Sequence, residues 1–191
     1  VLFDANNNMY FRARLSDAST QFTFFKADAT GAKTAITLPA RGDASTPDIG
    51  AFGVSPDGAT LVFSADAPTA GVFDVYKAAT ADLANPTKIT AVTPINTQVL
   101  NATFTAPIAF SPDGTTVYFL SAKSGSQQLY AIPAAGGVPK QLTDLPLDVG
   151  AFKLSPDGKR VALGLETFVD CAADLACTKK KLDAANADTT P

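Results

Sequence analysis

Short apolar runs separated by turn residues recur along the whole chain, and this pattern predicts β-strands. The runs Leu61–Phe63 and Val117–Leu120 are β-branched and aromatic, a composition typical of strands buried on both faces of a sheet. A second apolar segment follows each run, in "GVFDVYKA" and "QQLYAIPA", and a closing "KIT" or "QLT" comes after it. Together with the apolar segment that precedes each run, this pattern predicts four strands per unit.

The tetrapeptide Ser-Pro-Asp-Gly stands three times between two apolar runs, starting at Ser55, Ser111 and Ser155. Proline presets φ at the first corner of a turn, aspartate bonds locally through its side chain, and glycine accepts a positive φ. Each copy therefore predicts the tight turn of a β-hairpin. The structural turn residues are Pro56, Asp57, Gly58, Pro112, Asp113, Gly114, Pro156, Asp157 and Gly158.

The three copies are 56 and 44 residues apart, and a period of this size indicates repeated supersecondary units. The longer interval predicts an insertion at Thr93–Phe104. A weaker copy opens the chain, since Met9–Phe11 aligns with Val117–Phe119 and "FDANN", rich in Asn that tolerates positive φ, replaces the turn. We therefore predict three units and the opening of a fourth, at about 1–40, 48–92, 105–145 and 149–170.

Four short antiparallel strands in a unit of about 40 to 45 residues are typical of a β-propeller blade. The expected fold is all-β: a partial propeller of three four-stranded blades plus the start of a fourth, with one short helical insertion at about 171–187. The sequence resembles the WD-like, Ser-Pro-Asp-Gly repeats of TolB and of the propeller domains of prolyl oligopeptidase family serine peptidases. This resemblance covers nearly the whole chain.

The segment Leu165–Pro191 is similar to a cysteine-bearing insertion in the propellers of secreted bacterial peptidases of that family, the acylaminoacyl and dipeptidyl peptidases. The resemblance implies a periplasmic or extracellular protein. It also implies a substrate-binding role for Glu166, because dipeptidyl peptidases hold the substrate's amino terminus with propeller glutamates, as a carboxylate suits an ammonium group. Those enzymes use a Glu-Glu pair, which this chain lacks, and the alternative is a solvated or capping carboxylate.

Cys171 and Cys177 are the only cysteines, and their C-x5-C spacing does not fit a zinc site. A disulfide between them requires Cys171 to lie before a helix and to fold back over its first turn. That bond fits an oxidising compartment, and free thiols in a cytoplasmic protein are the alternative. The helix is expected after Cys171, with Asp174 leading and Lys179–Lys181 following, the order that the helix dipole favours.

The 191 residues are 46% hydrophobic and 17% charged, a composition typical of an ordered globular protein. The net charge is −3, and Lys179–Lys181 is the only lysine cluster, so nucleic acid is not an expected partner. No apolar run reaches the roughly 18 residues of a membrane helix, so membrane insertion is not expected.

The chain has no histidine and no Gly-x-Ser-x-Gly, so it carries neither a Ser-His-Asp triad nor the nucleophile elbow of an α/β-hydrolase. Turn chemistry accounts for Asp57, Asp113 and Asp157, so no metal or cofactor is expected. The tripeptide Arg-Gly-Asp at Arg41–Asp43 is interpreted as a solvated loop.

A propeller closes with four to eight blades, so three units and a fragment would leave strand edges bare. The expected partners are the remainder of the propeller and an α/β-hydrolase domain, with a peptide as substrate; a homo-oligomer is the alternative. The expected function is the lid and substrate-size filter of a secreted serine peptidase. The alternative is a non-enzymatic, TolB-like scaffold that binds a protein in the cell envelope.

Overall fold

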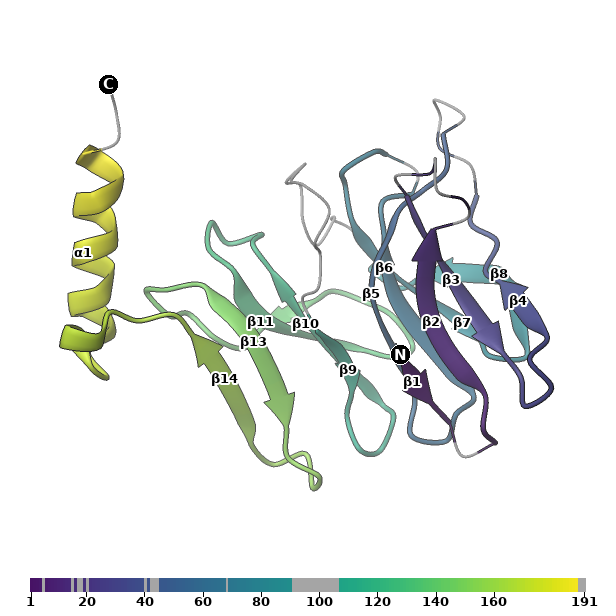
Figure 1. Cartoon of the computed structure of the whole chain (residues 1–191). Helices are drawn as coiled ribbons and strands as arrows, with labels where there is room; N and C mark the ends of the chain where they lie inside the picture. The colour runs from purple at the N-terminus through teal and green to yellow at the C-terminus, as the bar shows by residue number, and fades with distance from the viewer. Residues whose placement is uncertain are drawn as a thin grey trace.

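The computed structural model describes residues 1–4, 6–14, 16, 19, 21–39, 41, 45–67, 69–90 and 107–188. Within these residues the strands form three four-stranded sheets and one two-stranded sheet, in which neighbouring strands are antiparallel. The sheets follow one another in chain order, and helix α1 (Leu175–Asp188) stands beyond the last of them (Figure 1). The predicted insertion at 93–104 lies outside the described residues.

Each four-stranded sheet is a simple meander. The first sheet contains β1 (Leu2–Phe3), β2 (Met9–Arg14), β3 (Phe22–Ala27) and β4 (Lys33–Ala35). The second contains β5 (Ile49–Val54), β6 (Thr60–Ala65), β7 (Asp74–Ala79) and β8 (Asp82–Lys88). The third contains β9 (Ile108–Phe110), β10 (Thr116–Ser121), β11 (Gln128–Pro133) and β12 (Lys140–Gln141), and the fourth contains β13 (Val149–Leu154) and β14 (Val161–Leu165).

The predicted fold class is therefore confirmed, with shifts in the boundaries of two closing strands. The strand expected at "QLT" is Lys140–Gln141, so that only Gln141 of that tripeptide lies in it. The closing strand expected at "KIT" instead runs over Asp82–Lys88, so that only Lys88 of the tripeptide lies in it. This strand contains Pro86, which has no N–H to donate and is tolerated because β8 is an edge strand of its sheet. Ile89 continues the pairing beyond the strand by donating its N–H to the carbonyl of Val75 at 2.9 Å.

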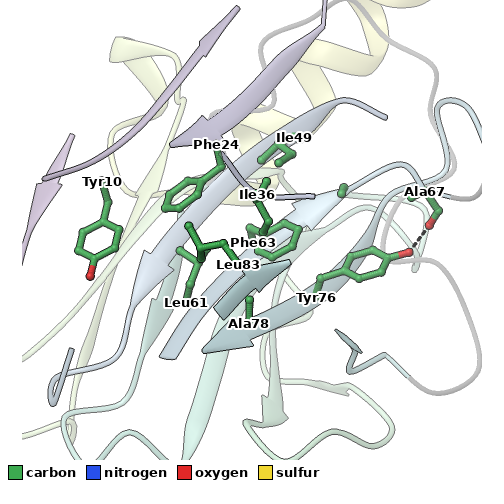
Figure 2. Close-up of a cluster of buried hydrophobic side chains, with 11 residues drawn as sticks. Tyr10, Phe24, Ile36, Ile49, Leu61, Phe63, Ala67, Tyr76, Ala78 and Leu83 are labelled. Carbon is green, nitrogen blue, oxygen red and sulfur yellow. Dashed lines mark hydrogen bonds between the residues drawn. The ribbon is translucent and has the colours of Figure 1, made fainter. Parts of the chain in front are cut away.

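Apolar side chains on alternate strand positions bury both faces of the second sheet. Leu61 and Phe63 belong to the cluster between the first and second sheets, which also contains Tyr10 and Phe24 (Figure 2). Val62, between them in sequence, belongs instead to the cluster between the second and third sheets. Because successive side chains of a strand point to opposite faces, a continuous apolar run is what such a doubly covered strand requires.

A third cluster joins the third and fourth sheets through Leu120, Leu129, Val149 and Phe152. The sheets are thus held in series by three separate apolar layers. On the fourth sheet, Ala151 and Ala162 lie exposed on the face away from the third sheet.

The three Ser-Pro-Asp-Gly turns have the same internal hydrogen bonds. In the first, the Ser55 hydroxyl donates to the Asp57 carboxylate at 2.5 Å and accepts the N–H of Thr60 at 2.9 Å, while Asp57 also accepts the N–H of Ala59 at 3.0 Å. The serine bond is the main reason why the pKa values of Asp57, Asp113 and Asp157 lie below their usual range. Each turn carboxylate is therefore already engaged in hydrogen bonds within its own turn.

Candidate functional site

A groove of about 710 Å³ lies between helix α1 and the loops of the third and fourth sheets. It contains Glu166, the residue that the peptidase resemblance singles out, directly after β14. The lining residues are Gly125, Ser126, Gln127, Pro146, Leu147, Asp148, Gly150, Glu166, Lys179, Leu182, Asp183 and Asn186.

The loop side of the groove is fixed by hydrogen bonds between Gln127 and the segment that enters β13. The N–H of Gln127 donates to Asp148 at 2.7 Å, and its side-chain amide donates to the carbonyl of Val149 at 2.8 Å. One edge of the groove is thus set where the third sheet meets the fourth.

The same connection recurs between the first and second sheets. There the N–H of Phe22 donates to Asp48 at 2.8 Å, and the Arg12 guanidinium donates to the carbonyl of Ile49 at 2.9 Å. The signal for it is in the sequence, since "DIGAF" at Asp48 returns as "DVGAF" at Asp148. The repeat precedes the Ser-Pro-Asp-Gly turn and was not recognised from the sequence, in which the turn motif alone set the alignment of the units.

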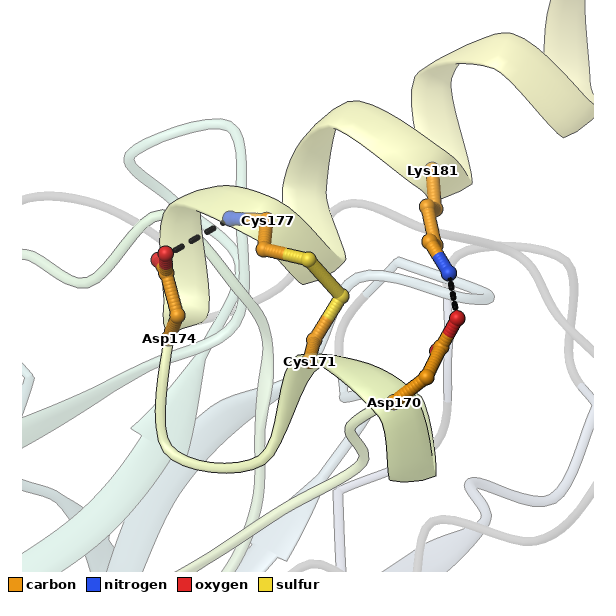
Figure 3. Close-up of a disulfide and its surroundings, with 5 residues drawn as sticks. All are labelled: Asp170, Cys171, Asp174, Cys177 and Lys181. Atoms are coloured by element: carbon orange, nitrogen blue, oxygen red, sulfur yellow. Dashed lines mark hydrogen bonds and ion pairs between the residues drawn. A yellow bond between two sulfur atoms is a disulfide. The ribbon is translucent and has the colours of Figure 1, made fainter.

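The helix side of the groove is held by a disulfide and an ion pair (Figure 3). Cys171 lies in a short 3-10 turn, Val169–Cys171, just before the helix. It forms a disulfide with Cys177 in the first turn of α1. Lys181 pairs with Asp170, and this pairing is the main reason why the pKa of Asp170 lies below its usual range. Asp174 accepts the N–H of Cys177 at 3.0 Å and so caps the start of the helix. These contacts tie the first turns of α1 to the 3-10 turn that precedes the helix.

The groove is richer in negative than in positive charge. Asp148, Glu166 and Asp183 supply three carboxylates, whereas Lys179 is the only cation in the lining and already pairs with Asp183. Glu166 is exposed. An ammonium group is the kind of ligand that such a surface attracts.

The turn aspartates lie apart from this groove, since none of them is among its lining residues. Within the described part of the chain, no group of three or more His, Cys, Asp or Glu residues is arranged to hold a metal ion. None of the described helices is both long and apolar enough to cross a membrane.

The interpretation of Arg41 as a residue of a solvated loop is wrong. Its side chain is buried and forms an ion pair with Asp66, which is buried as well. Asp66 also accepts the N–H of Asp48 at 2.6 Å and that of Gly71 at 2.9 Å. Arg41 thus neutralises a buried carboxylate beside the entry to β5; the other two residues of the tripeptide lie outside the described part.

Comparison with solved structures defines the class of fold as a TolB-like β-propeller. A putative TolB from Agrobacterium tumefaciens matches 86% of this chain with a TM-score of 0.64 and 18% identity, and the match covers 52% of that structure. TolB from Acinetobacter baumannii matches 82% of this chain with a TM-score of 0.56 and 25% identity, over 34% of its own length. A chain of a nidogen/laminin complex matches 84% of this chain with a TM-score of 0.58 but only 13% identity, over 54% of its own length.

Comparison by sequence gives a narrower match. No family model matches the chain. A stretch of 53 residues, 27% of the chain, is 42% identical to the "Uncharacterized peptidase YuxL" of Bacillus subtilis and spans 8% of that protein. The chain thus covers about half or less of each structure named above and a small part of this peptidase.

Proposed function

We propose that this chain is the propeller part of a secreted serine peptidase, in which it covers a catalytic α/β-hydrolase domain and admits only short peptides. The observation that carries the proposal is the 42% identity over 53 residues to a protein named as a peptidase. The chain has no histidine, so nucleophile, acid and base belong to the hydrolase domain. The disulfide between Cys171 and Cys177 supports a periplasmic or extracellular location.

In this proposal the groove beside α1 holds the amino terminus of the peptide through Glu166. Support comes from its carboxylate-rich lining and from the exposure of Glu166. A charge-assisted hydrogen bond contributes about 1.5 to 3 kcal/mol, which corresponds to a tenfold or larger effect on affinity.

The peptidase proposal is tested on the natural polypeptide that contains this chain. An antibody raised against the chain isolates that polypeptide from the producing cells, and a fluorophosphonate probe reports a reactive serine. We expect a polypeptide several-fold heavier than 19.7 kDa that the probe labels. An unlabelled polypeptide overturns the proposal, and a heat-denatured sample controls for non-specific labelling.

The role of Glu166 has a separate test on the 191-residue chain itself, which has no Ser-His-Asp triad and so does not cleave the peptide. The chain is titrated calorimetrically with trialanine and with N-acetyl-trialanine. We expect the free peptide to bind about tenfold more tightly, and Glu166→Gln to abolish the difference. The matched control is Asp144→Asn, which removes an exposed carboxylate outside the groove lining. Equal affinity for the two peptides contradicts the role of Glu166 but leaves the probe experiment unaffected.

A second candidate function is a non-enzymatic scaffold that binds a protein partner in the cell envelope. The similarity to two TolB structures favours it, one of them at 25% identity. Here the natural polypeptide contains a complete propeller without a hydrolase domain. Absence of probe labelling, together with co-purification of a stoichiometric protein partner, supports the scaffold.

A further inference from the structure

A cavity of about 430 Å³, which we call the inter-sheet pocket, lies between the second and third sheets. Its lining includes Thr60 at the start of β6, Ala79 at the end of β7, and Gly114 of the second Ser-Pro-Asp-Gly turn. It also includes Ala134, which follows β11, whereas the groove beside α1 is lined by Gln127, which precedes β11. The pocket and the groove therefore lie at opposite ends of the third sheet.

One wall of the inter-sheet pocket is polar and carries a single cation. The ammonium group of Lys77 donates to the carbonyl of Ala134 at 3.0 Å. Because an ammonium group has three N–H donors, Lys77 can bind an anion while it keeps this bond. Thr87 is the direct partner of Lys77 across β7 and β8, so its hydroxyl lies on the same side of the sheet. None of the described residues that line the pocket is acidic.

The wall formed by the third sheet is apolar. Phe110, at the end of β9, and Ala134 line the pocket and also pack against the apolar cluster between the second and third sheets. This wall therefore continues a layer of the core. Pockets for small molecules have volumes of about 300 to 1,000 Å³ and combine an apolar lining with a few polar groups, as this pocket does.

The corresponding place between the first and second sheets holds a much smaller cavity, of about 140 Å³. There Lys26 of β3 donates to the carbonyl of Thr80 at 3.1 Å, as Lys77 of β7 donates to that of Ala134. Thr80 and Ala134 each follow directly after the third strand of their sheet. The two cavities are thus repeats of one site, and they can be compared residue by residue.

The first difference between the two cavities is the side chain that fills the space. Leu83 lines the smaller cavity, is only 3% exposed, and stands three residues after the carbonyl that accepts the lysine. Gly137 stands at the same distance in the third sheet. Both residues lie against the preceding sheet, since the carbonyl of Leu83 accepts the N–H of Thr37 and the N–H of Gly137 donates to the carbonyl of Ile89, each at 3.0 Å. A glycine at this position leaves the space open.

The second difference is the charge beside the lysine. Asp28 stands two residues after Lys26 and lines the smaller cavity. Ala79 stands two residues after Lys77 and lines the inter-sheet pocket. The larger cavity therefore keeps the lysine of the repeated site and lacks its carboxylate.

We propose that the inter-sheet pocket binds a small carboxylic acid with an aromatic or aliphatic body. Lys77 holds the carboxylate through a charge-assisted hydrogen bond, with the hydroxyl of Thr87 as a further donor. The body of the ligand packs against Phe110. Because the pocket and the groove are at opposite ends of the sheets, this binding does not depend on the peptidase or scaffold function.

The proposal is tested by nuclear magnetic resonance titration of the isotopically labelled chain with hydrocinnamate, its neutral amide hydrocinnamamide, and acetate. We expect hydrocinnamate to bind with a Kd of about 1 mM or tighter and to shift the amide signals of Lys77 and Phe110. The other two probes lack the charge or the aromatic body, so each should bind at least about tenfold more weakly. Absence of hydrocinnamate binding at about 10 mM overturns the proposal, and so does equal affinity for either of the other probes.

Two lysine variants show whether the binding belongs to this pocket. Lys77→Met removes the charge but keeps an apolar stem, and we expect it to weaken hydrocinnamate binding at least about tenfold. The matched control is Lys26→Met, which removes a lysine that is half-buried in the same way and forms the equivalent bond to the next sheet. This control should keep the wild-type affinity. Equal losses in the two variants would trace the effect to contact between sheets and overturn the proposal.

Two substitutions of Ala79 separate charge from size. Ala79 is exposed, so both variants fold, as their amide spectra will verify. Ala79→Asp places a carboxylate where the smaller cavity has Asp28, and we expect it to weaken hydrocinnamate binding at least about tenfold. Ala79→Asn has nearly the same size without the charge and should bind as the wild type does. An Ala79→Asp variant with wild-type affinity, or an Ala79→Asn variant that binds as weakly as Ala79→Asp, overturns the proposal.

Discussion

At the scale of single residues, the glycine of the Ser-Pro-Asp-Gly turn has two structural tasks. It adopts a positive φ, 72° at Gly58, 71° at Gly114 and 68° at Gly158. It also lies against the turn of the preceding sheet: a Cβ added to Gly158 would meet Cδ of Pro112 at 2.9 Å, whereas one added to Gly114 would lie 3.7 Å from Cδ of Pro56. The turn motif therefore contributes to packing between sheets as well as to the hairpin.

This difference predicts unequal effects for two matched substitutions. Gly114→Ala introduces backbone strain alone and should lower the free energy of unfolding by about 1 to 2 kcal/mol. Gly158→Ala adds a steric conflict with Pro112 and should cost about 1 kcal/mol more, since overpacking costs about 1 to 3 kcal/mol. Urea denaturation monitored by circular dichroism measures both. Equal losses would contradict the role of close packing between turns.

The first turn of the chain offers a prediction about pH. Burial alone would raise the pKa of Asp4, but hydrogen bonds from Asn8, Tyr10 and Asn6 outweigh it and lower this pKa from 3.8 to about 2. A folded-state pKa below the unfolded value means that Asp4 stabilises the fold above pH 3.8 and that this stabilisation is lost as the pH falls towards about 2.

Urea unfolding between pH 2 and pH 5 should therefore show a smaller loss of stability on acidification for Asp4→Asn than for the wild type. Asp57, Asp113 and Asp157 keep their lowered pKa values in both proteins, so both lose some stability in acid. Parallel pH profiles would show that Asp4 has no special role.

At the scale of elements, helix α1 depends on contacts close to its own start. The disulfide, the Asp170–Lys181 pair and the Asp174 cap all lie within residues 170–181. Thr178 and Cys171 are the buried residues of this segment, while most of the helix is exposed. The start of α1, on the helix side of the groove, is thus held by contacts within a short stretch of sequence.

Reduction of the disulfide should loosen α1 without unfolding the sheets. Closing a loop of this size contributes about 2 kcal/mol in the chain-entropy model. Hydrogen exchange followed by mass spectrometry, with and without reductant, should show faster exchange in 169–188 and unchanged protection in β6 and β7. The Cys171→Ala/Cys177→Ala double variant should behave like the reduced protein. Unchanged exchange in α1 would mean that packing alone holds the helix.

The strands and their order could be predicted because each depends on local patterns. Alternation and β-branched runs mark strands such as β6 and β10, and the repeated turn marks the hairpins. The burial of Arg41 could not be predicted, because its partner Asp66 is 25 residues away and nothing in the local pattern links them. The groove beside α1 is of the same kind, since it is formed by residues from Gly125 to Asn186 that meet only in the folded chain.

At the scale of the whole molecule, the sheets form a series in which apolar layers join successive sheets. The three clusters join the first to the second, the second to the third, and the third to the fourth sheet. In such an arrangement stability is approximately the sum of the unit stabilities and the nearest-neighbour interfaces. A substitution should therefore act according to its place in the series.

Two truncations of equivalent strand positions test this arrangement. Phe63 in β6 is fully buried between the first and second sheets. Phe63→Ala should therefore lower the free energy of unfolding by about 3 to 5 kcal/mol, and backbone hydrogen exchange should become faster throughout the first three sheets. Leu163 in β14 is half-buried against the cluster between the third and fourth sheets. Leu163→Ala should therefore lower the free energy of unfolding by only about 1 to 2 kcal/mol, and backbone hydrogen exchange should become faster only in the fourth sheet and α1. Hydrogen exchange in low urea distinguishes the two patterns. If Leu163→Ala raised exchange equally in β6, the chain would unfold as one cooperative unit, and the fourth sheet would have to be counted as part of the central core rather than as its end.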